Sequence, residues 1–127
     1  MLPMVDRRLL LEASDLFNRK LYFECHDLLE EAWSEATGED REFLQALIHA
    51  SVGLYHVAAG NHKGAVSLLS RAVLGLAPHA PERDGVDVEG LLGKLRPLLV
   101  KTERALSGEP VEWSADDVPR MVVAALE

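Results

Sequence analysis

The stretch that decides the fold reads Phe43-Leu44-Gln45-Ala46-Leu47-Ile48-His49-Ala50-Ser51-Val52-Gly53-Leu54-Tyr55-His56-Val57-Ala58-Ala59. Twelve of these seventeen residues are apolar, one is Gly53, and only four are polar. A helix that is apolar on nearly every side is buried by neighbouring helices. The stretch is short for a bilayer span and carries two histidines and a glutamine. We therefore predict the buried centre of a helical domain and reject a membrane segment.

Capping and turn residues divide the rest of the 127-residue chain into further helices. Gly38 and Gly60 can end two helices, and Asn61 and Asp87 can begin two more. No stretch shows the sustained alternation of Val, Ile and Thr that a strand requires. We predict helices over residues 6–18, 21–37, 40–59, 61–75 and 87–106, the last kinked or split at Pro97, and a short helix over 117–126 with Pro119 in its first turn.

This pattern predicts an all-α protein, a compact bundle of five to six helices built on antiparallel helical hairpins around the buried helix of residues 40–59. We expect one domain over residues 1–127, with a loop at 77–86 and C-terminal helices within 87–127. Trp113 is expected to pin the tail to the body. The apolar residues beyond Pro110 are compatible with a homodimer, and equally with a tail that packs on its own core.

Composition excludes several classes of protein. The net charge is −8, with 13 Lys and Arg against 21 Asp and Glu, which opposes general binding to nucleic acid. The single cysteine excludes an internal disulfide and a thiolate zinc cluster, and it fits a reducing cytosol. The amino terminus lacks a charged leader followed by an apolar run. We therefore expect a cytoplasmic protein with no nucleic-acid or membrane partner.

Charge is segregated along the chain. Residues 24–42 hold eight acidic side chains against Arg41 alone, whereas residues 43–81 hold no acid and include Lys63, Arg71 and four histidines. The helix of residues 21–37 is thus an anionic element beside a neutral-to-basic one. This arrangement favours pairing of the two helices and can draw a cation between them. Most of the carboxylates are expected to form a solvated face.

The helix of residues 21–37 carries two polar residues at the edge of its apolar stripe. His26 and Glu30 lie one turn apart there, and Trp33 follows a further turn along. A carboxylate at the edge of a core must be hydrogen-bonded or bound to a cation, because stranding its charge is costly.

The central helix offers a partner stripe that contains Gln45, His49 and His56. In an antiparallel hairpin about Gly38, His49 is expected opposite the gap between His26 and Glu30, and His56 opposite Tyr22. The predicted cluster is therefore His26, Glu30 and His49.

Two imidazoles and one carboxylate are a ligand set that one divalent ion, Zn²⁺, Mn²⁺ or Fe²⁺, accepts with a position left open for water. His56 and Tyr22 are expected around this metal or small-ligand site, with Trp33 excluding water. The same residues also predict a hydrogen-bonded structural network in a non-catalytic interaction or scaffold module, and both interpretations stay open. The chain has no nucleophile elbow and no His-Glu-x-x-His, so no enzyme class is predicted.

Two further patterns have alternative interpretations. Asn61, His62, Lys63 and Gly64 combine the free N–H groups of a helix start with a cation, which suits a phosphate, although an ordinary cap and close helix packing explain them too. Residues 25–33 and 65–73 share a small-then-large packing pattern similar to helical-hairpin repeats that bind peptides. Two units are too few for a solenoid, so we predict a compact bundle with repeat-like packing.

The sequence also resembles the family called domain of unknown function 309, over about residues 13–76. The resemblance rests on Phe17-Asn18, on the run from Tyr22 to Trp33, on Phe43 to His49, on His56, and on Gly60 to Ala65 with Leu68-Leu69. The characteristic motif of the family is His-x-x-x-Glu-x-x-Trp/Tyr, which His26, Glu30 and Trp33 match. The resemblance implies a small all-helical protein, for which metal binding at this motif has been suggested. Cys25 and Asp27 stand where Ala or Val and Glu are common, and the segment beyond Pro78 carries no such resemblance.

Overall fold

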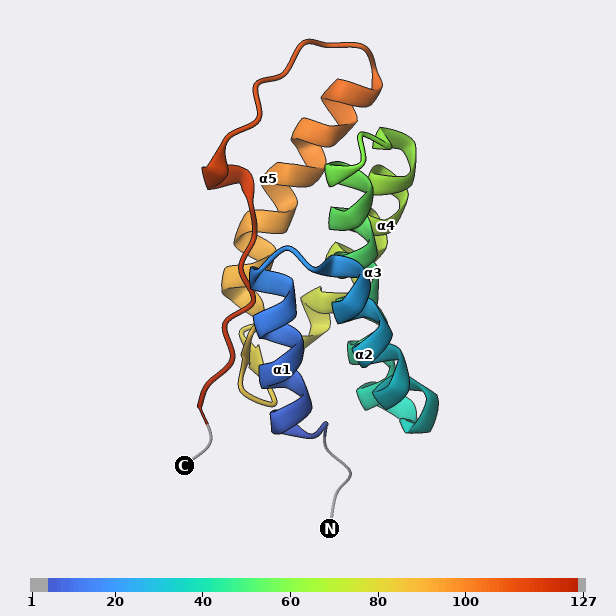
Figure 1. Cartoon of the computed structure of the whole chain (residues 1–127), viewed down its shortest axis with the longest axis vertical. Coiled ribbons are helices and arrows are strands. Elements are labelled where there is room, and N and C mark those ends of the chain that lie inside the picture. The colour runs from blue at the N-terminus through green and yellow to red at the C-terminus, as the bar shows by residue number, and fades with distance from the viewer. Residues whose placement is uncertain (1–4, 126–127) are drawn as a thin grey trace.

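The computed structural model describes residues 5–125. Within that range the chain forms five α-helices (Figure 1): α1 (Arg7–Asn18), α2 (Tyr22–Glu35), α3 (Gly38–Ala58), α4 (His62–Leu76) and α5 (Val88–Leu106). The all-α prediction is confirmed, and these five boundaries fall within about two residues of the expected ones. Two of the expectations concern residues outside the described range. These are residues 1–4, which belong to the amino terminus expected to lack a leader, and residue 126, where the last helix was expected to end.

The central position of α3 is confirmed by its burial. Helices α2 and α4 both pack against it, α5 packs on α4, and α1 packs on α2. Ten residues of α3 are buried, including Phe43, Leu47 and Leu54. Among residues 5–125, no helix combines the length and the apolar character needed to cross a membrane.

Helices α3 and α4 approach closely because two glycines leave room between them. A Cβ built on Gly75 would lie 2.8 Å from the Cβ of Ala46, and one on Gly53 would lie 2.9 Å from the side chain of Leu69. Both distances are far below ordinary carbon contacts. The core of the hairpin formed by α3 and α4 therefore depends on residues that have no side chain.

Helix α5 runs without interruption through Pro97, so it is not split there. Proline removes one backbone hydrogen bond from a helix interior. Leu95 and Leu98 on either side are buried, and their packing holds the helical turn despite that loss. Tertiary burial thus overrides local propensity at this position.

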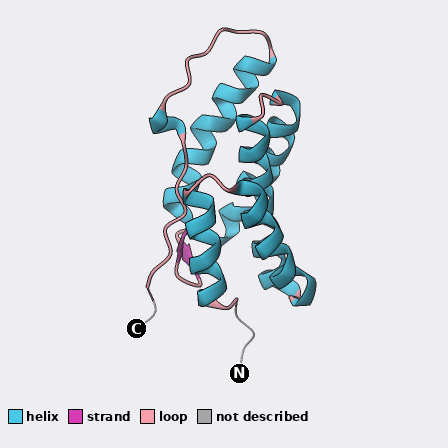
Figure 2. Cartoon of the chain, in the orientation of Figure 1, coloured by secondary structure: helices cyan, strands magenta, loops and turns pink. Residues whose placement is uncertain are grey.

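The predicted loop at residues 77–86 contains regular structure that the sequence analysis missed. A short 3₁₀ helix, η1 (Ala77–His79), is followed by a two-stranded antiparallel hairpin of β1 (Glu82–Arg83) and β2 (Val86–Asp87), the small strand region in Figure 2. Asp84 and Gly85 form its turn with φ of 50° and 86°. An Asp-Gly pair suits the two positive φ values that a tight hairpin turn requires.

The prediction of a last helix over residues 117–126 is wrong. Up to residue 125, where the described chain ends, the tail forms only the 3₁₀ helix η2 (Ala115–Asp117) and then continues extended along α5 and past α1 (Figure 1). The amide of Asn18 bonds both backbone groups of Met121, at 2.8 and 2.9 Å. These long-range bonds, together with burial of Met121, stabilise an extended tail on its own core in place of a helix.

The tight contact between α3 and α4 predicts opposite effects for two glycines. Gly75→Ala is expected to destabilise the protein by about 1–3 kcal/mol, because the added methyl group overpacks against Ala46. Gly93→Ala in α5 has nothing within 4 Å of the new Cβ and is expected to stabilise by about 0.5–1 kcal/mol. Urea unfolding measures both. Equal effects of the two substitutions would contradict this account of the helix contact.

Candidate functional site

His26 lies on α2 between two carboxylates. Its Nε2 is 3.1 Å from Oε1 of Glu30, and its Nδ1 is 3.5 Å from Oδ1 of Asp27 and 3.2 Å from the carbonyl oxygen of Phe23. The side chain of His26 is 19% exposed, whereas those of Glu30 and Asp27 are 52% and 61% exposed. The imidazole is thus partly sheltered and the carboxylates face solvent.

The contacts of the His26 ring define what its second nitrogen can do. A carbonyl oxygen only accepts hydrogen bonds, so a hydrogen bond to Phe23 requires the proton on Nδ1. In the neutral ring the Nε2 then presents a lone pair to a carboxylate oxygen of Glu30. Two acceptors at this distance need a second ring proton or a bound cation between them. His26, Asp27 and Glu30 each offer one ligand atom, and these three atoms lie within 4.8 Å of one another.

His49 does not join this cluster, which corrects the predicted three-residue convergence. Its Nε2 lies 3.0 Å from the amide nitrogen of Gln45 one turn earlier on α3. The α3 residues that share a cavity with His26 are Val52, Tyr55 and His56. The level of α3 relative to α2 is close to the expected one, since Cys25 contacts Ser51 and Tyr22 lines the same cavity as His56. His49 is instead turned toward α4, and Val52 is the residue that lines the cavity with His26. Of the predicted structural network, the contact between His26 and Glu30 is present and His49 lies outside it.

His49 instead lines an open groove beside α4, of about 420 Å³, together with Trp33 and Arg71. Burial lowers the pKa of His49, and the positive charge of Arg71 lowers it further. The guanidinium of Arg41 stacks over the ring of Trp33 at 3.9 Å. Trp33 thus packs under an arginine and does not cover His26.

Tyr22 and His56 lie near His26, as expected for residues around the site. All three line a cavity of about 130 Å³ with Val52. The Nδ1 of His56 is 3.2 Å from the side-chain nitrogen of Asn61. Burial raises the pKa of Tyr22, and the neighbouring Cys25 raises it further.

The predicted anion-binding residues at the start of α4 form a helix cap. The side-chain oxygen of Asn61 accepts a hydrogen bond from the backbone N–H of Gly64 at 3.0 Å. The ring of His62 stacks on Trp113 at a centroid distance of 6.1 Å, which attaches the tail to α4 as predicted. A Cβ on Gly64 would meet Asn61 and His56. One of the first-turn amides that a phosphate would use, that of Gly64, is therefore already paired.

Sequence reasoning missed an ion cluster around Arg83 on the hairpin. Its Nη2 donates to Asp40 at 2.6 Å and its Nη1 lies 3.0 Å from Nδ1 of His79. Burial alone would lower the pKa of Arg83, but the hydrogen bond to Asp40 and the charge of Asp84 outweigh it and raise the pKa. The Asp84-Gly85 turn was the available signal, because it predicts a hairpin next to Arg83.

Comparison with known proteins supports the family resemblance. Residues 10–68 match the family described as Domain of unknown function (DUF309), which confirms that resemblance for this segment. Helices α2 and α3, most of α1 and the first half of α4 lie within it. The chain is also similar to an uncharacterized protein, YpuF of Bacillus subtilis (strain 168), with 38% identity over 53 residues. That match covers 41% of this chain and 30% of the relative. Neither description names an activity.

The lowered pKa of His49 predicts a stability change with pH. Because the folded pKa lies below the ordinary 6.5, the unfolded chain binds more protons, and stability present above pH 6.5 is lost as the pH falls below it. His49→Gln is expected to reduce this loss in urea unfolding. Arg71→Met is expected to raise the pKa of His49 in an NMR titration, whereas Lys63→Met leaves it unchanged. An unshifted His49 pKa in the wild type would contradict the assignment.

Proposed function

We propose that this helical domain binds a divalent metal ion through His26 and Glu30, with Asp27 as a third oxygen ligand or as a group that orients the ring. The observation that carries the proposal is the Nε2 of His26 facing a carboxylate oxygen of Glu30 at 3.1 Å. A cation between the two satisfies both lone pairs at once. Imidazole nitrogen with carboxylate oxygen suits Zn²⁺, Mn²⁺ or Fe²⁺.

The surroundings of these residues favour a site that is open to solvent. Glu30 and Asp27 are more than half exposed, so water would complete the coordination of an ion held there. The carbonyl of Phe23 fixes the ring of His26 through Nδ1, and such a partner for the distal nitrogen is typical of histidines that bind metals. With one imidazole and two exposed carboxylates, we expect reversible binding and not a permanently held structural ion.

A second candidate function is a non-catalytic interaction module, and the groove of Trp33, Arg41 and Arg71 favours it. Leu74 at its edge is 76% exposed. Neither arginine forms an ion pair with any residue in the range 5–125. A partner with apolar and acidic side chains would fit this groove, and its binding would be independent of Glu30.

Metal titration tests the proposed site. Isothermal titration calorimetry with Zn²⁺ and Mn²⁺ on untagged, chelator-treated protein is expected to show one ion per chain. Glu30→Gln and His26→Gln are each expected to weaken binding by at least about tenfold, because each removes a ligand. Glu31→Gln serves as the control, since it removes an exposed carboxylate from the same helix outside the cluster.

Circular dichroism of each variant shows whether the fold is kept. Glu30 is more than half exposed and the partly sheltered His26 lies outside the buried core, so both substitutions are expected to be tolerated. Equal binding by Glu30→Gln and Glu31→Gln would mean that the ion is attracted by the general negative charge of α2. That outcome, or no binding of either ion by the wild type, would contradict the proposed site and leave the interaction module.

A further inference from the structure

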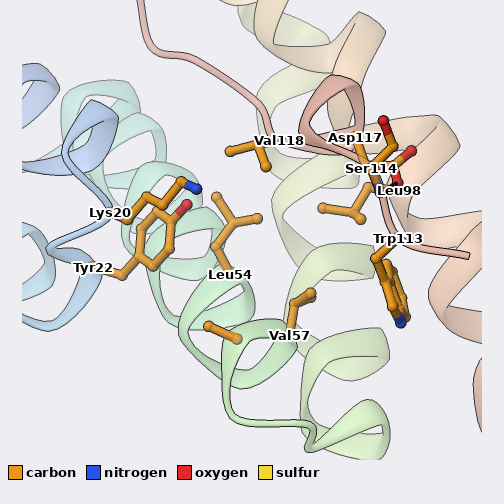
Figure 3. Close-up of a pocket in the computed structure, with 10 residues that line it drawn as sticks. Lys20, Tyr22, Leu54, Val57, Leu98, Trp113, Ser114, Asp117 and Val118 are labelled. Carbon is orange, nitrogen blue, oxygen red and sulfur yellow. Dashed lines mark hydrogen bonds between the residues drawn. The ribbon is translucent and has the colours of Figure 1, made fainter.

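A second cavity, of about 300 Å³, lies where the tail crosses the helical core. Figure 3 shows that its wall combines the turn between α1 and α2, the end of α3, the middle of α5 and the tail around η2. The apolar part of the wall includes Leu54, Val57, Leu98 and Val118. This volume is at the lower end of the range for small-molecule sites, which are mostly apolar with a few placed polar groups.

The polar groups of the cavity differ between its two sides. Lys20 and Tyr22 lie on one side, and Asp117 and Ser114 lie on the other (Figure 3). Asp117 is already paired, because Lys101 donates to its Oδ2 at 2.7 Å and the backbone N–H of Ser114 does so at 2.7 Å. These bonds lower the pKa of Asp117, so the carboxylate stays ionised, and Lys101 balances its negative charge.

Lys20 and Tyr22, in contrast, keep donors available to the cavity. Within the described part of the chain, Lys20 forms no ion pair and the hydroxyl of Tyr22 makes no hydrogen bond. Tyr22 is only 6% exposed as a residue, but its hydroxyl oxygen is not closed off from solvent, so it can donate to a ligand in the cavity. Lys20 has a φ of 64°, a left-handed conformation at a helix end where glycine is usual. A lysine there carries a strain that a glycine would avoid.

The far wall of the cavity is fixed independently of any ligand. Ser114 and Asp117 form a reciprocal cap on η2, and Lys94 donates to the carbonyl of Asp116 at 2.8 Å. Trp113 lies between the ring of His62 and the ammonium group of Lys101. The cavity is therefore formed before binding, which avoids the entropy cost of ordering a loop on a ligand.

From this geometry we infer that the tail cavity binds a small amphipathic carboxylic acid. Its carboxylate is held by Lys20 and the hydroxyl of Tyr22, and its apolar body lies on Leu54 and Leu98. On the opposite side Asp117 is already bonded by Lys101 and by the backbone of Ser114, so that side offers the acid group no unpaired charge, and Lys20 and Tyr22 set the direction of binding. An amine gains little at that side, because Lys101 already neutralises Asp117. This site is separate from the proposed metal site and does not depend on it.

The chemistry of the head group provides the test. Octanoate, octanol and octylamine are titrated into the full chain by isothermal titration calorimetry, so that three ligands share one apolar body. Octanoate is expected to bind at one site and at least about tenfold more tightly than octanol, as a charge-assisted hydrogen bond contributes. Lys20→Met is expected to abolish that preference, whereas Lys63→Met, an exposed lysine on α4, keeps it.

Two further variants locate the ligand. Tyr22→Phe keeps the buried ring and removes only the donor, so octanoate is expected to bind about threefold to tenfold more weakly. Ala58→Phe adds a ring from an exposed position on the cavity wall and is expected to prevent binding of all three ligands while the fold is kept. Glu30→Gln is expected to bind octanoate as the wild type does.

Three results would overturn the inference. These are no binding of octanoate by the wild type, equal binding of octanoate and octanol, and tighter binding of octylamine than of octanoate. Unchanged octanoate binding by Ala58→Phe would place the ligand elsewhere and would overturn it as well. Loss of metal binding in the calorimetry of the preceding section changes none of these outcomes, so the two sites are tested separately.

Discussion

The burial of α3 on nearly all its sides is the constraint on which the rest of the structure depends. A helix that is apolar all round needs neighbours on every face, and α2, α4 and the segments beyond them supply these. The closest of these neighbours is α4, whose approach requires Gly53 and Gly75 to lack side chains. This close packing fixes which face of α3 is left for α2. The positions of His26 and His49 relative to each other follow from it.

Local sequence signals were sufficient for the helical core and failed where distant segments decide the structure. Gly60 adopts the positive φ that ends α3, and Asn61 caps α4 as its side chain predicts. Gly38 also has a positive φ, but it begins α3, because α2 already ends at Glu35. The tail has a helical start signal in its acidic residues and in Pro119. It is extended because Asn18, more than a hundred residues earlier, bonds both backbone groups of Met121, and no local pattern records such a contact.

The candidate site likewise has one part that local sequence predicts and another that depends on how separate helices pack. His26 and Glu30 are one turn apart on a single helix, so the helical period alone brought them together correctly. Placing His49 required the rotation of one helix about its axis relative to another. The two helices lie level as expected, but His49 is turned toward α4 and Val52 lines the cavity with His26. The tail cavity could not be predicted from the sequence, because its wall comes from four segments that are separate in the chain. Its polar groups, Lys20 on one side and Asp117 on the other, come from two of these segments.

The thiol of Cys25 makes the interior of this domain observable by chemistry. It is completely buried between α1 and α3, where its sulfur lies 3.3 Å from both the carbonyl of Ala13 and the hydroxyl of Ser51. Burial raises its pKa to about 11, so at neutral pH the sulfur is a thiol and alkylating reagents react only with its ionised form. The labelling rate of this single cysteine therefore reports how often the three N-terminal helices separate, without an introduced dye or a foreign side chain.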